Sequence, residues 1–402
     1  MRQAKPLKHV PTPAYVIDIE RLRQNLAILH DVSEKSGCRV LLAQKAFSAY
    51  DLYPLIGQYL DGTAASGIFE ARLGHEYMPD GEVHVYSPAF RDEELADVLL
   101  LADHIVFNSF SQWTRFKPLV ETFKREGRTH VSCGLRINPG YSEVAVEIYN
   151  PAAPGSRLGL TLEAFRHGAE TVGLEGLDGI HFHALCEDSA ETLERTLDHV
   201  YSDFLPYMES WPGGLKWFNL GGGHHITRDD YNRPLLIDLL CDAKKRTSAA
   251  IYIEPGEAIA LNAGVLVSSV LDVGQNAEHF AILDTSAVCH MPDVLEMPYR
   301  PRCRVHYADG GEADGRMPSE AAYAYHLGGP TCLAGDVIGQ YAFPRPLTAG
   351  DRIVFFDMAI YTMVKTNTFN GMPLPALVTQ DGADIRVLQT FDYEDFRMRL
   401  GS

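Results

Sequence analysis

The sequence predicts an α/β protein: a (β/α)8 barrel of the TIM type followed by a C-terminal β domain. Two observations lead to this prediction. Between residues 40 and 254, eight short β-branched runs alternate with helical patterns, which is typical of a closed barrel. After about residue 262, strand-like runs are separated by turn signals and no long amphipathic helix intervenes, which predicts a β domain.

The predicted barrel strands are Val40–Ala43, Gly62–Ala65, Glu82–Tyr86, His104–Asn108, Val131–Ile137, Gly179–His183, Trp217–Leu220 and Ile251–Glu254. The helical patterns between them are Ser48–Tyr59, Ile68–Glu76, Asp92–Ala102, Ser111–Glu126, Thr161–Val172, Ala190–Met208 and Arg233–Ser248. An open doubly wound sheet is the alternative, and it would normally carry a glycine-rich fingerprint after its first strand. Here Gln44, Lys45 and Ala46 follow that strand instead, which favours the closed barrel.

The strand-like runs of the second domain are Val265–Val273, Ala277–Leu283, Arg302–Tyr307, Val337–Phe343 and Arg352–Asp357. The segment Ala14–Asp18 also has the pattern of a strand, and it could join either domain. We therefore expect a barrel over residues 19–262 and a β domain over residues 263–402 that also takes residues 1–18.

Composition and charge exclude several classes of protein. With 402 residues, 46% hydrophobic and 22% charged, the chain is not a disordered, collagen-like or coiled-coil protein. A net charge of −18 without a basic block argues against a nucleic-acid partner. Seven scattered cysteines without a CxxC pair fit a reducing compartment. The N-terminal residues lack the apolar region of a signal peptide, and no stretch has the length and apolarity to span a bilayer. We expect a cytoplasmic protein with no membrane partner.

Lys45 and two histidines stand at the ends of predicted barrel strands, where function sits in this fold. A lysine leaving a strand is commonly a surface residue, but Ala46 and Phe47 give Lys45 apolar surroundings. A partly desolvated amine loses its proton more easily and can form a Schiff base. Strand alternation places His181 and His183 on one face. They can be packed side chains, an HxH metal pair, or a flat ring that stacks on a planar cofactor. Metal-dependent barrels place such a pair after the first strand, so we expect no metal.

Glycines and a carboxylate follow the last two predicted barrel strands. The run Gly221–Gly223 lets backbone N–H groups approach an anion, and the loops after strands seven and eight are the usual phosphate site of barrels. Such a run can also be only a tight turn. Glu254, followed by Pro255 and Gly256, is placed either to face a bound group or to cap a turn.

Together, a lysine, a flat ring, a glycine cradle and a carboxylate predict a site for pyridoxal 5'-phosphate. The lysine would bind the aldehyde, the glycines the phosphate, and the carboxylate would keep the ring nitrogen protonated, which makes the ring an electron acceptor. In the second domain, the loop Gly328–Asp336 holds Cys332, and Tyr361 follows a strand. A buried inert thiol is the ordinary interpretation of such a cysteine.

The chain resembles the fold-type III pyridoxal-phosphate-dependent decarboxylases, which are related to alanine racemase and include ornithine and diaminopimelate decarboxylases. The resemblance covers nearly the whole chain and rests on elements in the family's order: Pro13-Ala14-Tyr15-Val16, the Lys45 strand, His183, the triple glycine, Glu254-Pro255-Gly256, Gly329-Pro330-Thr331-Cys332 and Ala359-Ile360-Tyr361-Thr362. It implies that the cofactor is held by Lys45, His183, Gly222, Gly223, Glu254, Gly256 and Tyr361.

Three stretches are similar to the branch of this family that acts on carboxynorspermidine and carboxyspermidine: residues 42–48, 254–257 and 289–296. Family members that act on amino acids usually place an arginine, directed at the phosphate, where this chain has Glu257. The resemblance implies that Glu257 and Asp293 contact the amines of a carboxylated triamine, since ammonium groups favour carboxylates. Cys186 stands near a position where some family members use serine on the phosphate, so we assign it no such role.

The resemblance also implies a reaction. Lys45 would hold the cofactor, CO2 would leave, and Cys332 would return a proton to Cα, with Lys45 as the alternative donor. It implies a homodimer with shared active sites, in which Cys332 and a substrate-binding Asp336 reach the site from the second subunit. The β domain would then contribute to the substrate site and the dimer interface. One methylene separates the two triamines, so the sequence does not choose between them.

Other functions fit parts of this pattern. A barrel racemase usually pairs the ring nitrogen of the cofactor with a cation, so the carboxylate of Glu254 argues against a racemase. A diaminopimelate decarboxylase does not usually have an acidic residue at position 257. A non-catalytic carrier of pyridoxal phosphate would normally consist of one barrel without a second domain. A metal hydrolase would need further histidine and aspartate ligands after later strands.

Overall fold

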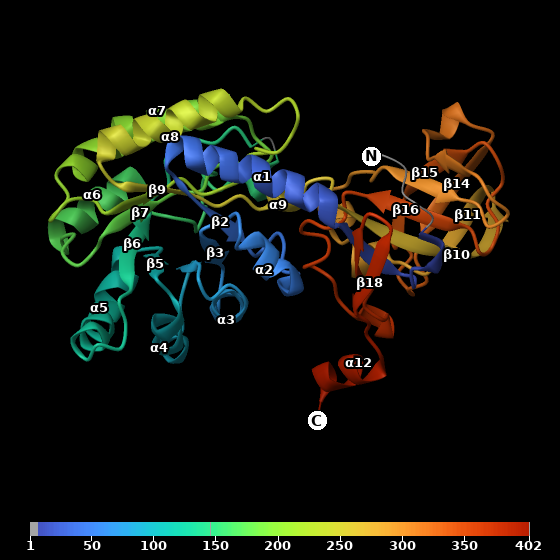
Figure 1. Cartoon of the computed structure of the whole chain (residues 1–402), viewed down its shortest axis with the longest axis horizontal. Helices are drawn as coiled ribbons and strands as arrows, with labels where there is room; N and C mark the ends of the chain where they lie inside the picture. Colours follow the sequence, from blue (N-terminus) through green and yellow to red (C-terminus); the bar gives the residue numbers. More distant parts are fainter. Residues whose placement is uncertain (1–6, 145, 402) are drawn as a thin grey trace. The chain divides into compact units, whose positions relative to one another are not determined.

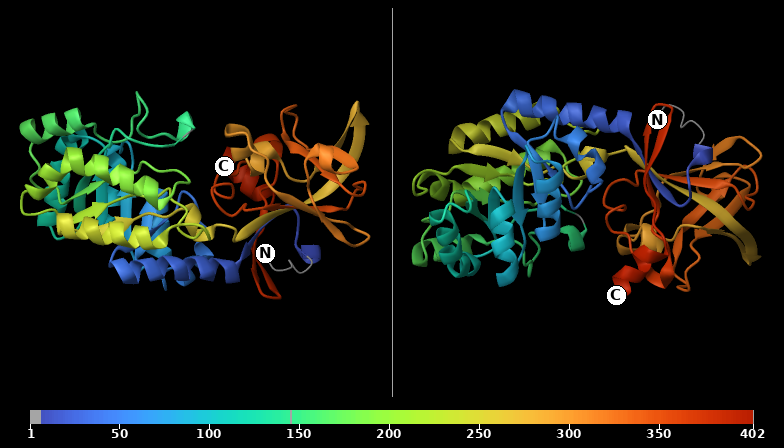
Figure 2. Two further views of the ribbon diagram at one scale, coloured as in Figure 1. Left: turned by 90° about the horizontal axis from the view of Figure 1, so that it is seen from above. Right: turned by 60° about the horizontal axis from the view of Figure 1, so that its bottom comes forward.

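The computed structural model describes residues 7–144 and 146–401 and divides the chain into two compact units (Figure 1 and Figure 2). One unit comprises Asn25–Ile259. The other combines the N-terminal residues up to Gln24 with the chain from Ala260 onward. Within the residues that the structure describes, no helix combines the length and the apolar character needed to cross a membrane.

Eight parallel strands form a closed barrel in the first unit, which confirms the predicted fold. They are β2 (Arg39–Ala43), β3 (Gly62–Ala65), β4 (Glu82–Tyr86), β5 (His104–Phe107), β6 (Ser132–Arg136), β7 (Gly179–His181), β8 (Trp217–Asn219) and β9 (Ala250–Ile253). The barrel closes where β9 pairs with β2, with Tyr252 beside Arg39 and Ile253 beside Val40. All eight strands therefore end on one face, which gathers the side chains that follow them.

Helices connect the strands and cover the barrel (Figure 1). They are α1 (Ile19–Ser36), α3 (Ile68–Tyr77), α4 (Asp92–Leu101), α5 (Phe110–Arg125), α6 (Leu162–Thr171), α7 (Ala190–Glu209), α8 (Arg233–Thr247) and the short α9 (Glu257–Ala260). The side-chain oxygens of Ser109, Thr161 and Ser189 accept hydrogen bonds from backbone N–H groups at the starts of α5, α6 and α7.

The helix predicted over residues 48–59 is shorter than expected. The chain instead forms a 3-10 turn, η2 (Tyr50–Leu52), and one short helix, α2 (Tyr53–Ile56). Pro54 lies in the first turn of α2. Because proline has no backbone N–H to donate, it is tolerated at a helix start but not inside a helix. The α-helix therefore begins at Tyr53, one residue before the proline, and does not run continuously from residue 48.

The second unit is built on a mixed sheet. Its strands are β1 (Ala14–Asp18), β10 (Gly264–Asn276), β11 (Glu278–Leu283), β12 (Cys303–His306), β13 (Glu312–Asp314), β14 (Tyr323–Gly328), β15 (Val337–Phe343), β16 (Arg352–Phe356), β17 (Ala376–Asp381) and β18 (Asp384–Gln389). The segment that could have joined either domain, β1, pairs antiparallel with β10 and parallel with β17. Valines from β1, β10, β16 and β17 pack together as its core: Val16, Val265, Val267, Val354 and Val378.

Short helical segments complete the second unit. They are α10 (Ala287–His290), α11 (Asp293–Glu296), α12 (Tyr393–Leu400) and the 3-10 turns η1 (Leu7–His9), η4 (Pro318–Glu320) and η5 (Phe369–Gly371), while η3 (Glu147–Tyr149) belongs to the barrel. Because α11 and the loop between β14 and β15 carry Asp293 and Cys332, the sheet positions two of the predicted site residues.

The amino ends of the barrel strands enclose a polar layer rather than an apolar one. The carboxylate of Glu82 accepts a hydrogen bond from Tyr252 Oη at 2.9 Å, forms an ion pair with Arg39 and contacts His84 Nε2 at 3.1 Å. His84 stacks on His104 with ring centroids 4.0 Å apart. Glu82, His84 and His104 form a group whose ligand atoms lie within 4.8 Å of one another, but Arg39 already neutralises its carboxylate. We therefore interpret this group as barrel packing.

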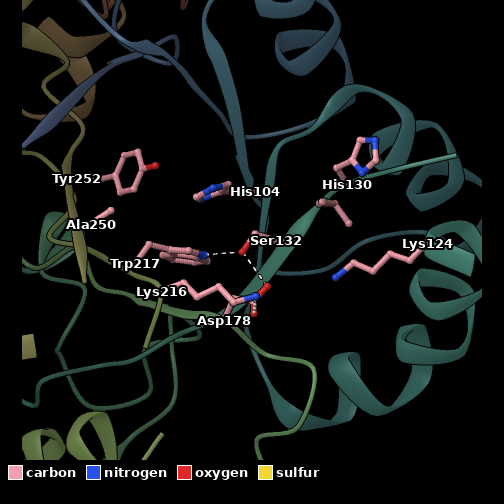
Figure 3. A pocket seen from close by; sticks show the side chains of 10 residues that line it. His104, Lys124, His130, Ser132, Asp178, Lys216, Trp217, Ala250 and Tyr252 are labelled. Atoms are coloured by element: carbon pink, nitrogen blue, oxygen red, sulfur yellow. Dashed lines mark hydrogen bonds and ion pairs between the residues drawn. The ribbon is translucent and has the colours of Figure 1, made fainter. Parts of the chain in front are cut away.

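A cavity of about 380 Å³ opens at the amino ends of the barrel strands (Figure 3). The predicted site lies at the opposite, carboxyl ends of these strands. In its wall, Trp217 Nε1 donates to Ser132 Oγ at 2.8 Å, and Ser132 Oγ donates to Asp178 at 2.9 Å. Lys216 forms an ion pair with the same aspartate at 2.6 Å. These hydrogen bonds fix the indole ring of Trp217 inside the amino-terminal half of the barrel.

Trp217 also explains two glycines in neighbouring strands, and this leads to a first prediction. Its buried indole ring lies against Gly134 and Gly179, where a Cβ atom would overlap the ring. We expect Gly179→Ala to lower the free energy of unfolding by about 1–3 kcal/mol through overpacking. Urea unfolding followed by circular dichroism measures the change.

Gly335→Ala is the matched control for this prediction. Gly335 is exposed in the turn before β15, its φ is not in the left-handed region, and nothing lies within 4 Å of a Cβ placed there. This variant should differ from the wild type by less than about 0.5 kcal/mol. Equal losses in the two variants would contradict the packing argument.

Candidate active site

The predicted barrel residues lie together at the carboxyl ends of the strands. Lys45 comes two residues after β2, His183 two residues after β7, and Glu254 directly after β9. Gly222 comes three residues after β8. The structure therefore brings four residues that are far apart in the sequence to one mouth of one barrel.

Lys45 is accessible to solvent in this mouth but surrounded by protein atoms. Desolvation lowers the pKa of its amine below the usual value; the Glu254 carboxylate opposes this effect, and the Arg136 guanidinium adds to it. An amine with a lowered pKa is more often unprotonated at neutral pH. Lys45 is therefore poised to act as a nucleophile.

His183 connects the lysine to the glycine loop. Its Nδ1 accepts a hydrogen bond from the Gly222 backbone N–H at 2.9 Å, and its Nε2 lies 3.5 Å from Lys45 Nζ. Burial and the neighbouring Lys45 lower the pKa of His183 well below its usual value, so the ring is neutral. Because Nδ1 is the acceptor, the ring proton is assigned to Nε2, which faces the lysine.

Glu254 is a mostly buried carboxylate beside this pair, with 16% of its side chain exposed. Asn219 Nδ2 donates to its Oε1 at 2.7 Å, and His181 Nε2 lies 3.6 Å from its Oε2. Burial alone would raise the pKa of Glu254, but His181 and Lys45 outweigh burial and lower it to about 2. Glu254 therefore stays ionised over the whole working pH range of an enzyme.

The glycine loop packs tightly against the neighbouring strand ends. A Cβ at Gly222 would overlap the carbonyl oxygen of Glu254, and Gly223 has a φ of +91°, which favours glycine. The carbonyl of Gly223 accepts a hydrogen bond from Asp188 N at 3.0 Å. Gly256 is buried in the turn that enters α9. The two loops thus form a close-fitting cradle of main-chain groups.

Sequence reasoning missed Arg136, the last residue of β6. Its guanidinium is almost fully buried, donates from Nη2 to the carbonyl of His183 at 3.1 Å and stacks over Tyr86 at 4.5 Å. The signal was available, because a charged residue that ends a barrel strand points to the functional face. Asn219 was missed in the same way, although it ends β8 directly before the glycines.

The second unit carries the remaining predicted residues. Asp293 accepts hydrogen bonds from Lys365 Nζ at 2.6 Å and from Thr362 Oγ1 at 3.1 Å. Asp336 is buried, and its carboxylate accepts from Ser286 Oγ at 2.9 Å and from Thr331 Oγ1 at 2.7 Å.

Two further predicted residues of this unit lie on loops. Cys332 is exposed on the loop between β14 and β15. Tyr361 has a φ of 44°, in the left-handed region that is unusual for a tyrosine. Sites with such strained backbone are often functional.

The comparisons with known proteins decide the family. A family model described as "Pyridoxal-dependent decarboxylase, C-terminal sheet domain" matches residues 14–359. The chain belongs to the pyridoxal-dependent decarboxylase family. The protein is therefore a decarboxylase whose cofactor is pyridoxal 5'-phosphate, as the lysine, the glycines and the carboxylate predicted.

Three similar proteins place the chain within the family. It is 42% identical over 394 residues to the carboxynorspermidine/carboxyspermidine decarboxylase of Campylobacter jejuni, covering 97% of this chain and 98% of the relative. It is 40% identical over 398 residues to the carboxyaminopropylagmatine decarboxylase of Synechocystis sp., covering 98% and 97%. The crystal structure of the Campylobacter jejuni carboxynorspermidine decarboxylase complexed with norspermidine superposes with a TM-score of 0.84 at 40% identity, covering 97% of this chain and 100% of that one.

The fold itself extends to more distant proteins. The diaminopimelate decarboxylase of Helicobacter pylori, complexed with L-lysine, has a TM-score of 0.81 at 18% identity, with 98% of each chain covered. At this identity the likeness shows a common fold and no more.

The residues of the barrel mouth fit the cofactor. Pyridoxal phosphate presents an aldehyde, a ring nitrogen and a phosphate, and the mouth offers the Lys45 amine, the ionised Glu254 carboxylate and the Gly222 cradle. The flat, neutral ring of His183 suits a planar aromatic group. Each part of the cofactor therefore has a chemically matched group among the described residues.

The role of Lys45 gives the second prediction. We expect Lys45→Ala to lose both the visible absorbance of the lysine-bound cofactor and the release of CO2, because no other described amine lies beside His183. Absorbance spectra and a CO2 assay measure the two losses. Lys35→Ala, on the exposed surface of α1, should retain both properties. A coloured, active Lys45→Ala enzyme would rule out the assignment.

Proposed function

We propose that the protein decarboxylates a carboxylated triamine, carboxynorspermidine or carboxyspermidine, and so releases CO2 with norspermidine or spermidine. The observation that carries this proposal is the 42% identity to a decarboxylase of this name over nearly the full length of both chains. A second enzyme of the same name, from Herminiimonas arsenicoxydans, is 35% identical over 393 residues. This activity would place the protein in polyamine biosynthesis.

Carboxyaminopropylagmatine is a second candidate substrate. The Synechocystis enzyme named for it is 40% identical to this chain, close to the 42% of the first relative. That substrate name indicates a guanidinium in place of a terminal amine. Ammonium and guanidinium groups both pair with carboxylates, so a carboxylate-bearing site suits either.

The barrel mouth supplies the groups that the reaction needs. When bound, pyridoxal phosphate takes up the electron pair that the departing carboxylate leaves at Cα. Lys45 would hold the aldehyde, the ionised Glu254 would keep the ring nitrogen protonated, and Gly222 and Gly223 would offer main-chain groups to the phosphate. The flat ring of His183 would bind the aromatic part of the cofactor. Gly256 and Tyr361 are the remaining residues that we propose as cofactor contacts.

Each turnover consumes one proton, because the bond from Cα to the carboxylate is replaced by a bond from Cα to hydrogen. We assign the donor as Cys332, with Lys45 as the alternative. Cys332 is one of the two exposed cysteines among the described residues, and its loop is held by the buried Asp336. An accessible thiol on a tethered loop can reach a ligand, whereas the buried thiols of the chain cannot.

We further propose a cytoplasmic homodimer with two shared active sites. Cys332 and Asp336 would come from the second subunit, and Asp336, Glu257 and Asp293 would contact the substrate. The acidic chain, with a net charge of −18, suits cationic polyamines and no nucleic acid. Seven free cysteines suit a reducing compartment.

Substrate choice is the third prediction. We expect CO2 release from carboxynorspermidine and carboxyspermidine with kcat/KM values within about 200-fold of each other, since one methylene is worth at most that factor. Diaminopimelate, ornithine and arginine should be slower by at least about a thousandfold, because they leave the carboxylates meant for the triamine unpaired. Carboxyaminopropylagmatine belongs in the same panel.

Each outcome of this panel has a definite meaning. A highest kcat/KM with carboxyaminopropylagmatine would select the second candidate. Equal rates with diaminopimelate would overturn both candidates.

The fourth prediction concerns the proton donor. Cys332→Ala should keep the cofactor absorbance and lower kcat by about 10²–10⁴-fold, the usual contribution of a general acid. Cys241→Ala, the other exposed cysteine, should be unaffected. An unchanged kcat in Cys332→Ala would assign the proton to Lys45.

Mixing two inactive variants tests whether the site is shared. If Cys332 comes from the second subunit, Lys45→Ala and Cys332→Ala chains that exchange subunits should regain about a quarter of wild-type activity, because half of the dimers then hold one intact site. No recovery after proven exchange would show that both residues serve the same chain.

A further inference from the structure

His225 and Glu257 form a side-chain pair in the barrel that sequence reasoning did not foresee. His225 lies in the loop after β8, just beyond the glycines, and Glu257 begins α9 after β9. The Nε2 atom of His225 is hydrogen-bonded to Glu257 Oε2. The two side chains are only 10% and 19% exposed. The carboxylate predicted to bind a substrate amine thus already has an internal partner.

This pair lies near the reacting lysine. The thiol of Cys186 has its pKa raised to about 12, first by burial and then by the Glu257 carboxylate, while Lys45 opposes the shift. Cys186 is therefore within electrostatic range of both Glu257 and Lys45. A charge on Glu257 is placed to act on a ligand that enters the same mouth.

The charges around His225 favour its protonated form. Burial alone would lower the pKa of His225, but the hydrogen bond and charge of Glu257, aided by Glu187, raise it above its usual value. Arg228 opposes the shift. The charged and titratable groups that act on His225 come from the loop after β7, the loop after β8 and α9: Glu187, Asp188, His224, Arg228 and Glu257.

The same hydrogen bond exists in two charge states. A neutral imidazole with its proton on Nε2 donates to Glu257 and leaves the pair with one negative charge. A second proton, on Nδ1, keeps the bond but cancels that charge. An ammonium group bound at the free oxygen of Glu257 is attracted only in the first state, because a nearby imidazolium repels it.

We propose that His225 is a positioning residue for the substrate: it directs the Glu257 carboxylate, and it gives up a proton to solvent when an ammonium group of the substrate binds there. This inference rests on the proposed function, since it needs a cationic substrate. It also follows that protons and substrate compete, because linkage between two binding events is reciprocal. The substrate amine replaces the imidazolium as the counter-charge of Glu257.

Competition between protons and substrate predicts in which direction KM changes with pH. Below the pKa of His225, each further pH unit should raise KM for the triamine about tenfold, while above that pKa KM should be constant. The pKa of His225 is raised by its hydrogen bond to Glu257, so the change in KM begins above the usual pKa of histidine. The rate constant kcat, measured at saturation, should not follow this change.

His225→Gln is the test variant, because a glutamine amide keeps an N–H donor but cannot be protonated. We expect the rise of KM on the acid side to disappear and the KM at high pH to remain within a few-fold of the wild-type value. His167→Gln, on the exposed surface of α6, controls for the titration of the substrate and should keep the wild-type profile.

Calorimetry gives a readout independent of turnover. Norspermidine has no carboxylate to lose, so its binding can be measured without CO2 release, and titrations in two buffers of different ionisation heat count the protons released. Near the pKa of His225, the wild-type holoenzyme should release more protons than His225→Gln, by about half a proton per site at the pKa itself. Glu257→Gln should bind norspermidine more weakly and lose the pH dependence, and it serves as a second variant if His225→Gln does not fold.

The outcomes separate this inference from the proposed function. If the wild type decarboxylates a triamine but His225→Gln keeps the acid rise in KM and the same proton release, the inference is wrong and the proposed function stands. If His225→Gln instead loses pyridoxal phosphate with unchanged triamine affinity, the pair serves the cofactor and the inference is also wrong. A wild type that neither binds nor decarboxylates any triamine would overturn both.

Discussion

The hydrogen bond from the Gly222 backbone N–H to His183 Nδ1, 2.9 Å long, organises the chemistry of the barrel mouth. A backbone N–H can only donate, so this bond makes Nδ1 an acceptor and disfavours a second proton on the ring. The remaining ring proton then points toward Lys45 Nζ at 3.5 Å. An N–H that faces an amine is compatible with the unprotonated form of that amine. One main-chain contact thus favours both a neutral imidazole and a nucleophilic lysine.

This contact depends on close packing that only glycine allows. A Cβ at Gly222 would overlap the carbonyl oxygen of Glu254, so any larger residue would push the loop away from His183. The geometry of the glycine loop, the ring of His183 and the strand end at Glu254 are therefore coupled. The loop that we propose to bind the phosphate is therefore the same loop that sets the protonation state of His183 beside the lysine.

Buried charges of opposite sign flank Lys45. The Glu254 carboxylate raises the pKa of the lysine and the Arg136 guanidinium lowers it, while desolvation is the largest influence and leaves the pKa lowered. Both flanking ions are held by hydrogen bonds: Asn219 donates to Glu254, and Arg136 donates to the carbonyl of His183. Such bonds offset the cost of burying a charge. The mouth can therefore hold two ions near an uncharged amine.

The barrel could be predicted from the sequence because its strands are short buried runs between clear helical patterns. Other elements lacked such a signal: β13 and β18 carry mostly exposed residues without regular alternation, since they lie at the edges of their sheet. The helix α1 is different, because Leu22, Leu26, Leu29 and Val32 have helical spacing and were overlooked.

The sequence predicted some parts of the site and not others. Residues that follow strands, such as Lys45 and Glu254, could be placed because the closed barrel gathers all strand ends on one face. The contact between His225 and Glu257 could not be predicted, because it depends on how two loops fold against each other. The same holds for the partners of Asp293, which come from residues about seventy positions further along the chain. Spacing along the sequence carries no information on such contacts.

Two of the carboxylates expected to bind the substrate share one electrostatic arrangement. Asp293 and Glu296 share the Lys365 ammonium, whose two contacts are each 2.6 Å, so the cluster carries a net charge of −1. Glu257 with a neutral His225 also carries −1. Neither carboxylate lacks a partner while the site is empty, which avoids the cost of an unpaired buried charge. The two arrangements differ in the cationic partner. Partial burial lowers the pKa of Lys365, but hydrogen bonds to its two carboxylates outweigh burial and raise it, so Lys365 stays charged. His225, in contrast, can lose its proton. The charge available to an ammonium group is therefore constant at Asp293 and depends on pH at Glu257.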